Sequence, residues 1–186
     1  MDRKEILIDA KNRMDNSLEV LHHDLAKVRT GRASASLLDS VLIEYYGQQV
    51  PINQAATISV PEPRLIVIQP WEKSVMGEIE KAIQKSDLGL NPANDGNLIR
   101  IPIPPLNEER RKEMVKLVKK FGEEARIAVR NIRRDANDHL KKLEKSNELS
   151  EDELSVELDE IQKLTDGHTA KIDEILSSKE KEVMEI

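Results

Sequence analysis

Arginines are concentrated on one short stretch of the chain, which reads AVRNIRRDAND at residues 128–138. Arg130, Arg133 and Arg134 lie in this stretch, and Arg126 stands just before it. At about 100° of rotation per residue, a helix places these four side chains within roughly 100° of one another and away from the apolar positions between them. A guanidinium donates hydrogen bonds in a planar fork that matches the oxygens of a phosphate. The stretch therefore predicts a phosphate-binding face on a helix, pointing to solvent.

The acidic residues within one helical turn test this interpretation. Glu123 stands three residues before Arg126, and Asp138 stands four residues after Arg134. Arg130 and Arg133 have no acidic residue at three or four positions in either direction. Both have like charges there, and such pairs cost roughly 0.2–0.5 kcal/mol each. An ordinary solvated face, neutralised by acidic residues of another helix, remains the alternative.

The charge of the chain is distributed unevenly. The formal net charge is −6, but residues 106–147 hold 13 basic and 8 acidic side chains, whereas residues 148–186 hold 4 and 13. Local basic charge of this kind attracts polyanions. Arg110, Arg111 and neighbouring lysines extend the basic surface. Aromatic residues make up only 2% of the chain, which argues against stacking on single-stranded bases and favours contact with the backbone of an RNA duplex.

Three segments with apolar residues at alternating spacings of 3 and 4 predict the helices that position the arginines: 1–30, 107–145 and 150–186. Ser150 and Glu153 have the form of a capping box at the start of the third helix. Thr165, Gly167 and His168 are expected to weaken the apolar stripe of that helix. Gly122 is expected to weaken the second helix, by up to ~1 kcal/mol relative to alanine. Long amphipathic helices of this kind predict a three-helix bundle.

The middle segment has a different character, because all eight prolines fall between residues 33 and 105. Residues 40–46, 56–60, 64–69 and 97–103 read as strands, and residues 72–86 read as a helix. Trp71 and Met76 are expected to pack in the core of this module. Tyr45 and Tyr46 are expected to point to opposite faces of their strand.

The position of this module predicts two domains in an α+β fold. Residues 1–30 and 106–186 are expected to form the bundle, and residues 31–105 an inserted β/α/β domain. Two chain crossings then join the domains, with a permissive backbone at Thr30-Gly31 and a stiff one at Pro104-Pro105. This arrangement predicts an elongated, hinged protein.

Signatures of catalysis, metal binding and membrane insertion are missing from the sequence. The chain has no cysteine, its four histidines have no metal-ligand spacing, and no glycine-rich phosphate loop or nucleophile elbow occurs. No apolar run approaches the ~20 residues of a membrane span. We expect a cytoplasmic monomer that is not an enzyme, with no cofactor and no metal.

Several long motifs resemble the bacterial ribosome recycling factor family: KVRTGRASASLLDSVLIEYYG (27–47), SDLGLNPANDGNLIRIPIPPLNEERRKE (86–113), ARIAVRNIRRDAND (125–138) and QKLTD (162–166). The resemblance implies an L-shaped, tRNA-like three-helix bundle with an inserted domain. It implies a factor that acts after termination and splits the ribosome into subunits with elongation factor G and its GTP hydrolysis. The bundle would lie on rRNA of the large subunit at the vacated tRNA sites, and the inserted domain would meet elongation factor G.

The resemblance also assigns roles to single residues. Arg130 and Arg133 match the arginines of the family's rRNA-facing helix, so we expect the nucleic-acid-binding set to be Arg29, Arg110, Arg126, Arg130, Arg133 and Arg134. The hinge is expected at Arg29, Thr30, Gly31 and Arg32 in the first crossing and at Pro104, Pro105 and Leu106 in the second. A coiled-coil adaptor that binds a partner helix through the acidic third helix is the alternative class of function.

Overall fold

The computed structural model describes residues 1–185, and these residues form two compact units. One unit combines Met1–Thr30 with Glu108–Glu185, and the other is the continuous segment Gly31–Asn107. Ile186, the last residue of the predicted bundle, lies outside the described residues.

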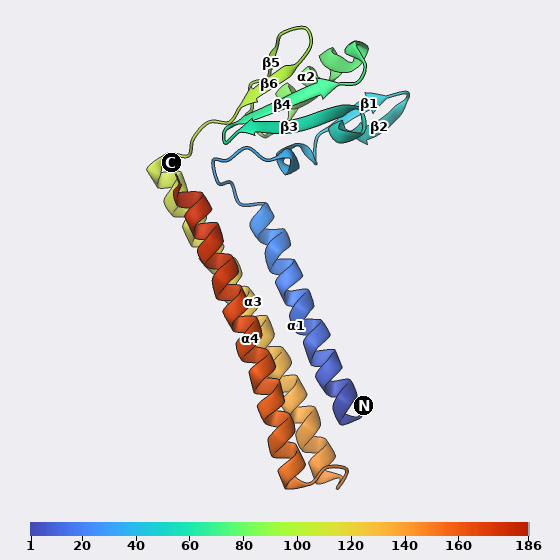
Figure 1. Cartoon of the computed structure of the whole chain (residues 1–186), viewed down its shortest axis with the longest axis vertical. Helices are drawn as coiled ribbons and strands as arrows, with labels where there is room; N and C mark the ends of the chain where they lie inside the picture. Colours follow the sequence, from blue (N-terminus) through green and yellow to red (C-terminus); the bar gives the residue numbers. More distant parts are fainter. Residues whose placement is uncertain (186) are drawn as a thin grey trace. The chain divides into compact units, whose positions relative to one another are not determined.

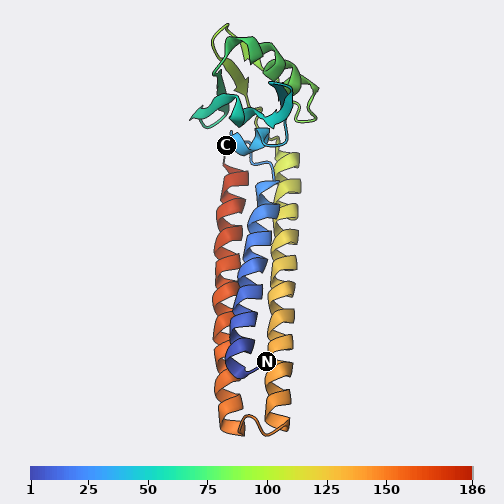
Figure 2. The same cartoon turned by 90° about the vertical axis from the view of Figure 1, so that its right-hand side faces the viewer.

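The first unit is a bundle of three long helices that all pack against one another (Figures 1 and 2). They are α1 (Arg3–Ala26), α3 (Glu108–Lys145) and α4 (Glu151–Met184). The bundle and the α+β class are confirmed. No helix in the described part of the chain is both long enough and apolar enough to cross a membrane.

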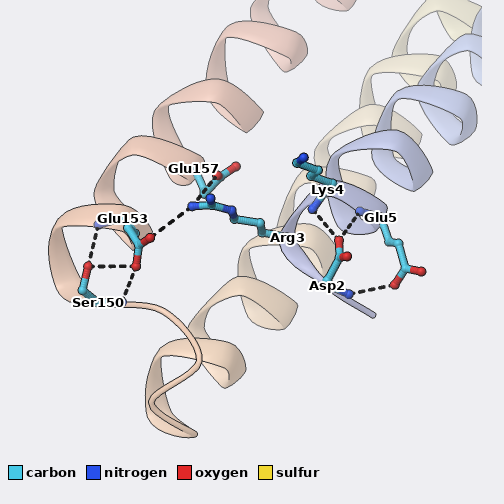
Figure 3. Close-up of polar contacts among 7 residues, drawn as sticks. All are labelled: Asp2, Arg3, Lys4, Glu5, Ser150, Glu153 and Glu157. Carbon is cyan, nitrogen blue, oxygen red and sulfur yellow. Dashed lines mark hydrogen bonds and ion pairs between the residues drawn. The ribbon is translucent and has the colours of Figure 1, made fainter.

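Capping boxes fix the first turns of α1 and α4 (Figure 3). The carboxylate of Asp2 accepts from the backbone N–H of Glu5 at 2.9 Å, and the Glu5 side chain accepts from the Asp2 N–H at 2.7 Å. Ser150 and Glu153 form the same pair of bonds at the start of α4. Arg3 donates to Glu153 at 3.2 Å and so joins the two capped ends. The capping box predicted at Ser150 is confirmed.

The core of the bundle follows the predicted seams, with one correction on α4. Its buried apolar residues are Ile6, Ala10, Met14, Leu21, Leu25, Val28, Val118, Ala125, Val129, Ile132, Ala136, Leu140, Leu149, Ile161, Ile172, Leu176 and Val183. Thr165 and His168 are buried too, at 4% and 3% exposure. The expectation that they weaken the stripe was wrong, because both side chains are buried and make polar contacts inside the bundle. The Thr165 hydroxyl donates to the Ile161 carbonyl at 2.8 Å.

His168 joins α4 to α1. Its Nδ1 lies 2.8 Å from the Leu164 carbonyl oxygen, and its Nε2 lies 2.7 Å from Oδ1 of Asp15. Asp15 also accepts from Lys11 at 2.7 Å. These two hydrogen bonds, from Lys11 first and His168 second, lower the pKa of Asp15 to about 2.

Gly122 has a packing role that its helix propensity does not reveal. A Cβ at this position would lie 2.2 Å from Cδ1 and 3.0 Å from Cγ of Leu176, so the glycine lets α4 approach α3 closely. The prediction that Gly122 weakens α3 was based on helix propensity alone and therefore left out this contribution from tertiary packing.

The second unit has two antiparallel sheets and one α-helix. The β1-β2 pair is a separate ribbon, and the other four strands form a sheet in the order β3-β4-β6-β5 (Figure 1). The strands are β1 (Leu42–Tyr45), β2 (Gln48–Pro51), β3 (Ala56–Glu62), β4 (Leu65–Pro70), β5 (Ala93–Asn94) and β6 (Ile99–Pro102), and the α-helix is α2 (Met76–Lys85). Short 3-10 turns are η1 (Ala35–Leu38), η2 (Ile52–Gln54) and η3 (Lys73–Val75). The sequence did not predict β2 or β5, which are both short. Inward residues such as Ile66, Ile68, Ile79, Ile99 and Ile101 form the core.

The prediction that Trp71 packs in this core was wrong, since the side chain is 60% exposed. Along β4 the buried positions are Ile66 and Ile68, and Trp71 falls on the opposite parity just beyond the strand. Its indole N–H donates to Oγ1 of Thr57 at 3.0 Å. Met76 is buried as predicted.

The two tyrosines also differ from expectation. Strand β1 ends at Tyr45, and Tyr46 has a φ of 50°, so strict alternation no longer applies. The rings meet edge to face with centroids 4.6 Å apart. The Tyr46 hydroxyl donates to Glu72 at 2.5 Å, and this hydrogen bond raises the pKa of Tyr46 to about 12.

Candidate nucleic-acid interface

The arginine stretch lies in the middle of α3, where its apolar neighbours Val129, Ile132 and Ala136 are buried in the bundle. The burial of these residues fixes the rotation of the helix. Arg130 and Arg134 are consequently exposed, whereas Arg133 lies closer to α4 and is half-buried. The prediction that the four arginines point to solvent holds for Arg130 and Arg134. It was wrong for Arg126 and Arg133, which are both half-buried.

Glu123 is shared by two arginines of this face. One of its oxygens lies 3.5 Å from Nη1 of Arg126, and the other lies 2.5 Å from Nη2 of Arg130. Arg126 also reaches Asp173 of α4 at 2.5 Å, and this hydrogen bond raises the pKa of Arg126. Neutralisation by the third helix, the alternative to a binding face, therefore occurs at Arg126.

The Arg130–Glu123 pair was missed because the sequence was tested only three and four residues away. Seven residues correspond to about two helical turns and return to nearly the same face, where two long side chains can meet. The side chain of Arg130 remains 49% exposed. Surface pairs of this kind contribute about 0–1 kcal/mol, so a phosphate can replace the carboxylate at little cost.

Arg133 has a different partner. Its Nη1 donates to Oε1 of Gln162 on α4 at 3.2 Å, and the Gln162 amide in turn donates to Asp166 at 2.8 Å. The Nε atom of Arg133 is buried without a hydrogen-bond partner. Sequence reasoning found Arg133 but not Gln162, because the pairing depends on the register between two helices that lie far apart in sequence. The QKLTD motif contains Gln162 and was the signal available.

The remaining arginines of the predicted set are dispersed. Arg134 forms no ion pair or side-chain hydrogen bond with any residue between 1 and 185, so the pair with Asp138 that the spacing allows is absent. Arg110 lies near the start of α3 and pairs with Glu113 at 3.0 Å. Arg29 lies just after α1 and takes part in interactions of its own.

The residues predicted as a hinge lie at the boundaries of the two units, which fall after Thr30 and after Asn107. Gly31 has a φ of +72°, a conformation that favours glycine. A Cβ on Gly31 would lie 3.6 Å from the backbone nitrogen of Leu106. The two crossings therefore run side by side at Gly31 and Leu106, and Arg32, Pro104 and Pro105 flank this point.

Comparison with known proteins identifies the family. Residues 21–184 match the family model described as "Ribosome recycling factor". The chain belongs to the ribosome recycling factor family. The ribosome-recycling factor of Geobacillus thermodenitrificans is 61% identical over 98% of this chain and 99% of its own length. That of Bacillus subtilis is 56% identical with the same coverage.

Solved structures of the family agree with this membership. A solution structure of the ribosome recycling factor has a TM-score of 0.78 and 44% identity, and the match covers 100% of this chain and 99% of that one. A second match has a TM-score of 0.69 and 51% identity, and the two chains cover each other fully. It is described as a model of the T. thermophilus ribosome recycling factor and E. coli elongation factor G bound to the E. coli post-termination complex.

Proposed function

We propose that this chain recycles ribosomes in the cytoplasm. It binds the post-termination ribosome at the vacated tRNA sites and, with elongation factor G and its GTP hydrolysis, promotes dissociation into subunits and release of mRNA and tRNA. The observation that carries the proposal is membership of the ribosome recycling factor family along nearly the whole chain. The chain itself is not an enzyme, and the free energy comes from the nucleotide of its partner.

The arginine face of α3 is the proposed contact with rRNA of the large subunit. Four guanidinium groups lie along it, and the carboxylates bound directly to them are Glu123 and Asp173. The face therefore keeps excess positive charge although the chain is acidic. Arg130 and Arg133 are the proposed principal contacts, and Arg29, Arg110, Arg126 and Arg134 extend the surface.

The inserted unit is proposed to meet elongation factor G. The crossings at Arg29–Arg32 and Pro104–Leu106 are proposed to act as a hinge, because the chain passes between the units after Thr30 and after Asn107, within or next to these segments. The long helices of the bundle bend little and can transmit the force applied by the factor.

Binding of the purified chain to isolated large ribosomal subunits, measured across a salt titration, tests the rRNA contact. Removing both arginines, with Arg130→Ala and Arg133→Ala, should lower the slope of log K against log salt by about 1.8, since each phosphate contact contributes about 0.9. The affinity should fall about 60-fold near 0.1 M salt on the same reasoning.

A charge-matched control separates this contact from general electrostatics. Lys4→Ala with Lys171→Ala removes two positive charges from exposed positions on α1 and α4 and should change the slope little. Splitting of post-termination ribosomes by elongation factor G and GTP, followed by light scattering, should fail with the arginine variant. Unchanged binding by that variant would support the coiled-coil adaptor instead.

A further inference from the structure

We propose that Gln162 is the positioning residue of Arg133, which it orients with a neutral acceptor so that the guanidinium keeps its full charge for an RNA phosphate. This inference rests on the proposed function, because the ligand is the rRNA backbone. The observation behind it is the chain of side chains Arg133–Gln162–Asp166 between α3 and α4.

The choice of an amide at this place is notable because α4 is strongly acidic. Residues 148–186 hold 13 acidic and 4 basic side chains. Other arginines that link helices of the bundle meet carboxylates: Arg3 meets Glu153, and Arg126 meets Asp173. Within residues 1–185, Arg133 forms no ion pair, and its one side-chain hydrogen bond goes to a neutral group.

Asp166 fixes the direction of the Gln162 amide. A guanidinium can only donate, and a carboxylate can only accept. The single orientation that satisfies both neighbours turns Oε1 of Gln162 to Arg133 and its N–H groups to Asp166. The carboxylate thus holds the amide while standing one side chain away from the guanidinium.

The guanidinium of Arg133 is held in place, but within the described range not all of its N–H donors have a hydrogen-bond partner. Nη1 contacts Gln162, Nε is buried without a partner, and Nη2 forms no hydrogen bond to a residue within the described range. Burying a donor without a partner is unfavourable, because the donor loses its hydrogen bonds to water and gains none in the protein. A surface selected only for stability would place a carboxylate here, whereas an RNA contact needs an arginine that is held in place and still charged.

A charge-conserving exchange tests the inference. Gln162→Glu combined with Asp166→Asn keeps the net charge and lets the two side chains hydrogen-bond with donor and acceptor exchanged. In the parent chain, the Gln162 side chain stands between Arg133 and the carboxylate of Asp166. In the variant, the carboxylate is at position 162 and contacts Arg133 directly. Affinity for isolated large ribosomal subunits should fall about 8-fold near 0.1 M salt, and the salt slope should decrease by about 0.9, as for loss of one phosphate contact.

The salt slope separates positioning from a structural role. If Gln162 only stabilises the bundle, the exchange leaves the slope of the parent chain unchanged, and that result overturns the inference. Arg133→Ala measured alongside identifies which proposal fails. If Arg133→Ala weakens binding and the exchange does not, the inference alone is wrong. If neither changes binding, Arg133 is not a contact, and the inference and the Arg133 assignment both fall.

If circular dichroism shows that the double exchange disturbs the fold, a single substitution is tested instead. Gln162→Glu is then compared with Asn12→Asp, which adds the same negative charge at an exposed position of α1. The inference requires Gln162→Glu to bind about 8-fold more weakly than the control near 0.1 M salt. Equal binding by the two variants refutes it.

Discussion

Gly122→Ala gives a sharp test of how α3 and α4 are packed, because helix propensity and tertiary packing predict opposite signs. Propensity favours alanine over glycine in a helix interior by up to about 1 kcal/mol. The new methyl group would lie 2.2 Å from Cδ1, 2.8 Å from Cδ2 and 3.0 Å from Cγ of Leu176, which is only 6% exposed. Because the close atoms include Cγ, rotation of the two methyl groups alone cannot relieve the overlap.

The expected magnitude follows from these two contributions. Overpacking a buried site costs about 1–3 kcal/mol, so the net effect of Gly122→Ala is a loss of about 0–2 kcal/mol. Gly167→Ala is the matched control, since Gly167 lies inside α4 and a Cβ there has nothing within 4 Å. That variant should gain up to about 1 kcal/mol. The two variants should therefore shift the unfolding free energy in opposite directions.

Urea unfolding of both variants, followed by circular dichroism, measures the difference. The double variant Gly122→Ala with Leu176→Ala adds a direct test of the contact. Truncation of a buried leucine costs about 2–5 kcal/mol, and the loss should be smaller when alanine already occupies position 122. If Gly122→Ala stabilises the chain as much as Gly167→Ala does, the close packing of Leu176 on Gly122 is refuted.

Three further substitutions have expected effects on the stability of the chain. Arg133→Met removes a buried, unpaired Nε, so thermal unfolding should show a stability equal to or above that of the parent, while large-subunit binding weakens; a large loss of stability would contradict the geometry. The pKa of Asp15 is lowered from 3.8 to about 2, so its hydrogen bonds to Lys11 and His168 stabilise the fold above about pH 4 and are lost as the pH falls through 2. The stability of the Asp15→Asn variant in acid unfolding should consequently depend less on pH between these values. The same pH dependence in the variant and the parent chain would show that these hydrogen bonds do not stabilise the fold. Ser150→Ala should cost about 0.5–2 kcal/mol in urea unfolding through loss of the α4 cap, and no change would mean that the cap is not formed in solution.

The sequence alone was sufficient for the helices and for much of the basic face. Apolar residues at spacings of 3 and 4 fixed the three long helices, since only one stripe of each can be buried. Local chemistry marked the ends, as at Ser150, where the capping box uses residues three apart. The clustering of Arg130, Arg133 and Arg134 was likewise visible, because rotation along one helix depends only on sequence separation.

Some features could not be determined from the sequence, because they depend on how separate helices and strands pack against one another. Thr165 and His168 are polar residue types, yet both are buried, because their polar atoms have contacts inside the bundle, such as that of His168 with Asp15. Trp71 is apolar and was expected inside, but strand parity places it outside.

The same division applies to the site. Residue type and spacing determined which cations lie on α3, because both are properties of one helix. Only the register of α3 against α4 decided that Asp173 meets Arg126 while the neutral Gln162 meets Arg133. The physical reason is that a side-chain hydrogen bond acts over about 3 Å, so its partner is determined by the placement of two helices whose contacting residues are tens of positions apart in the chain.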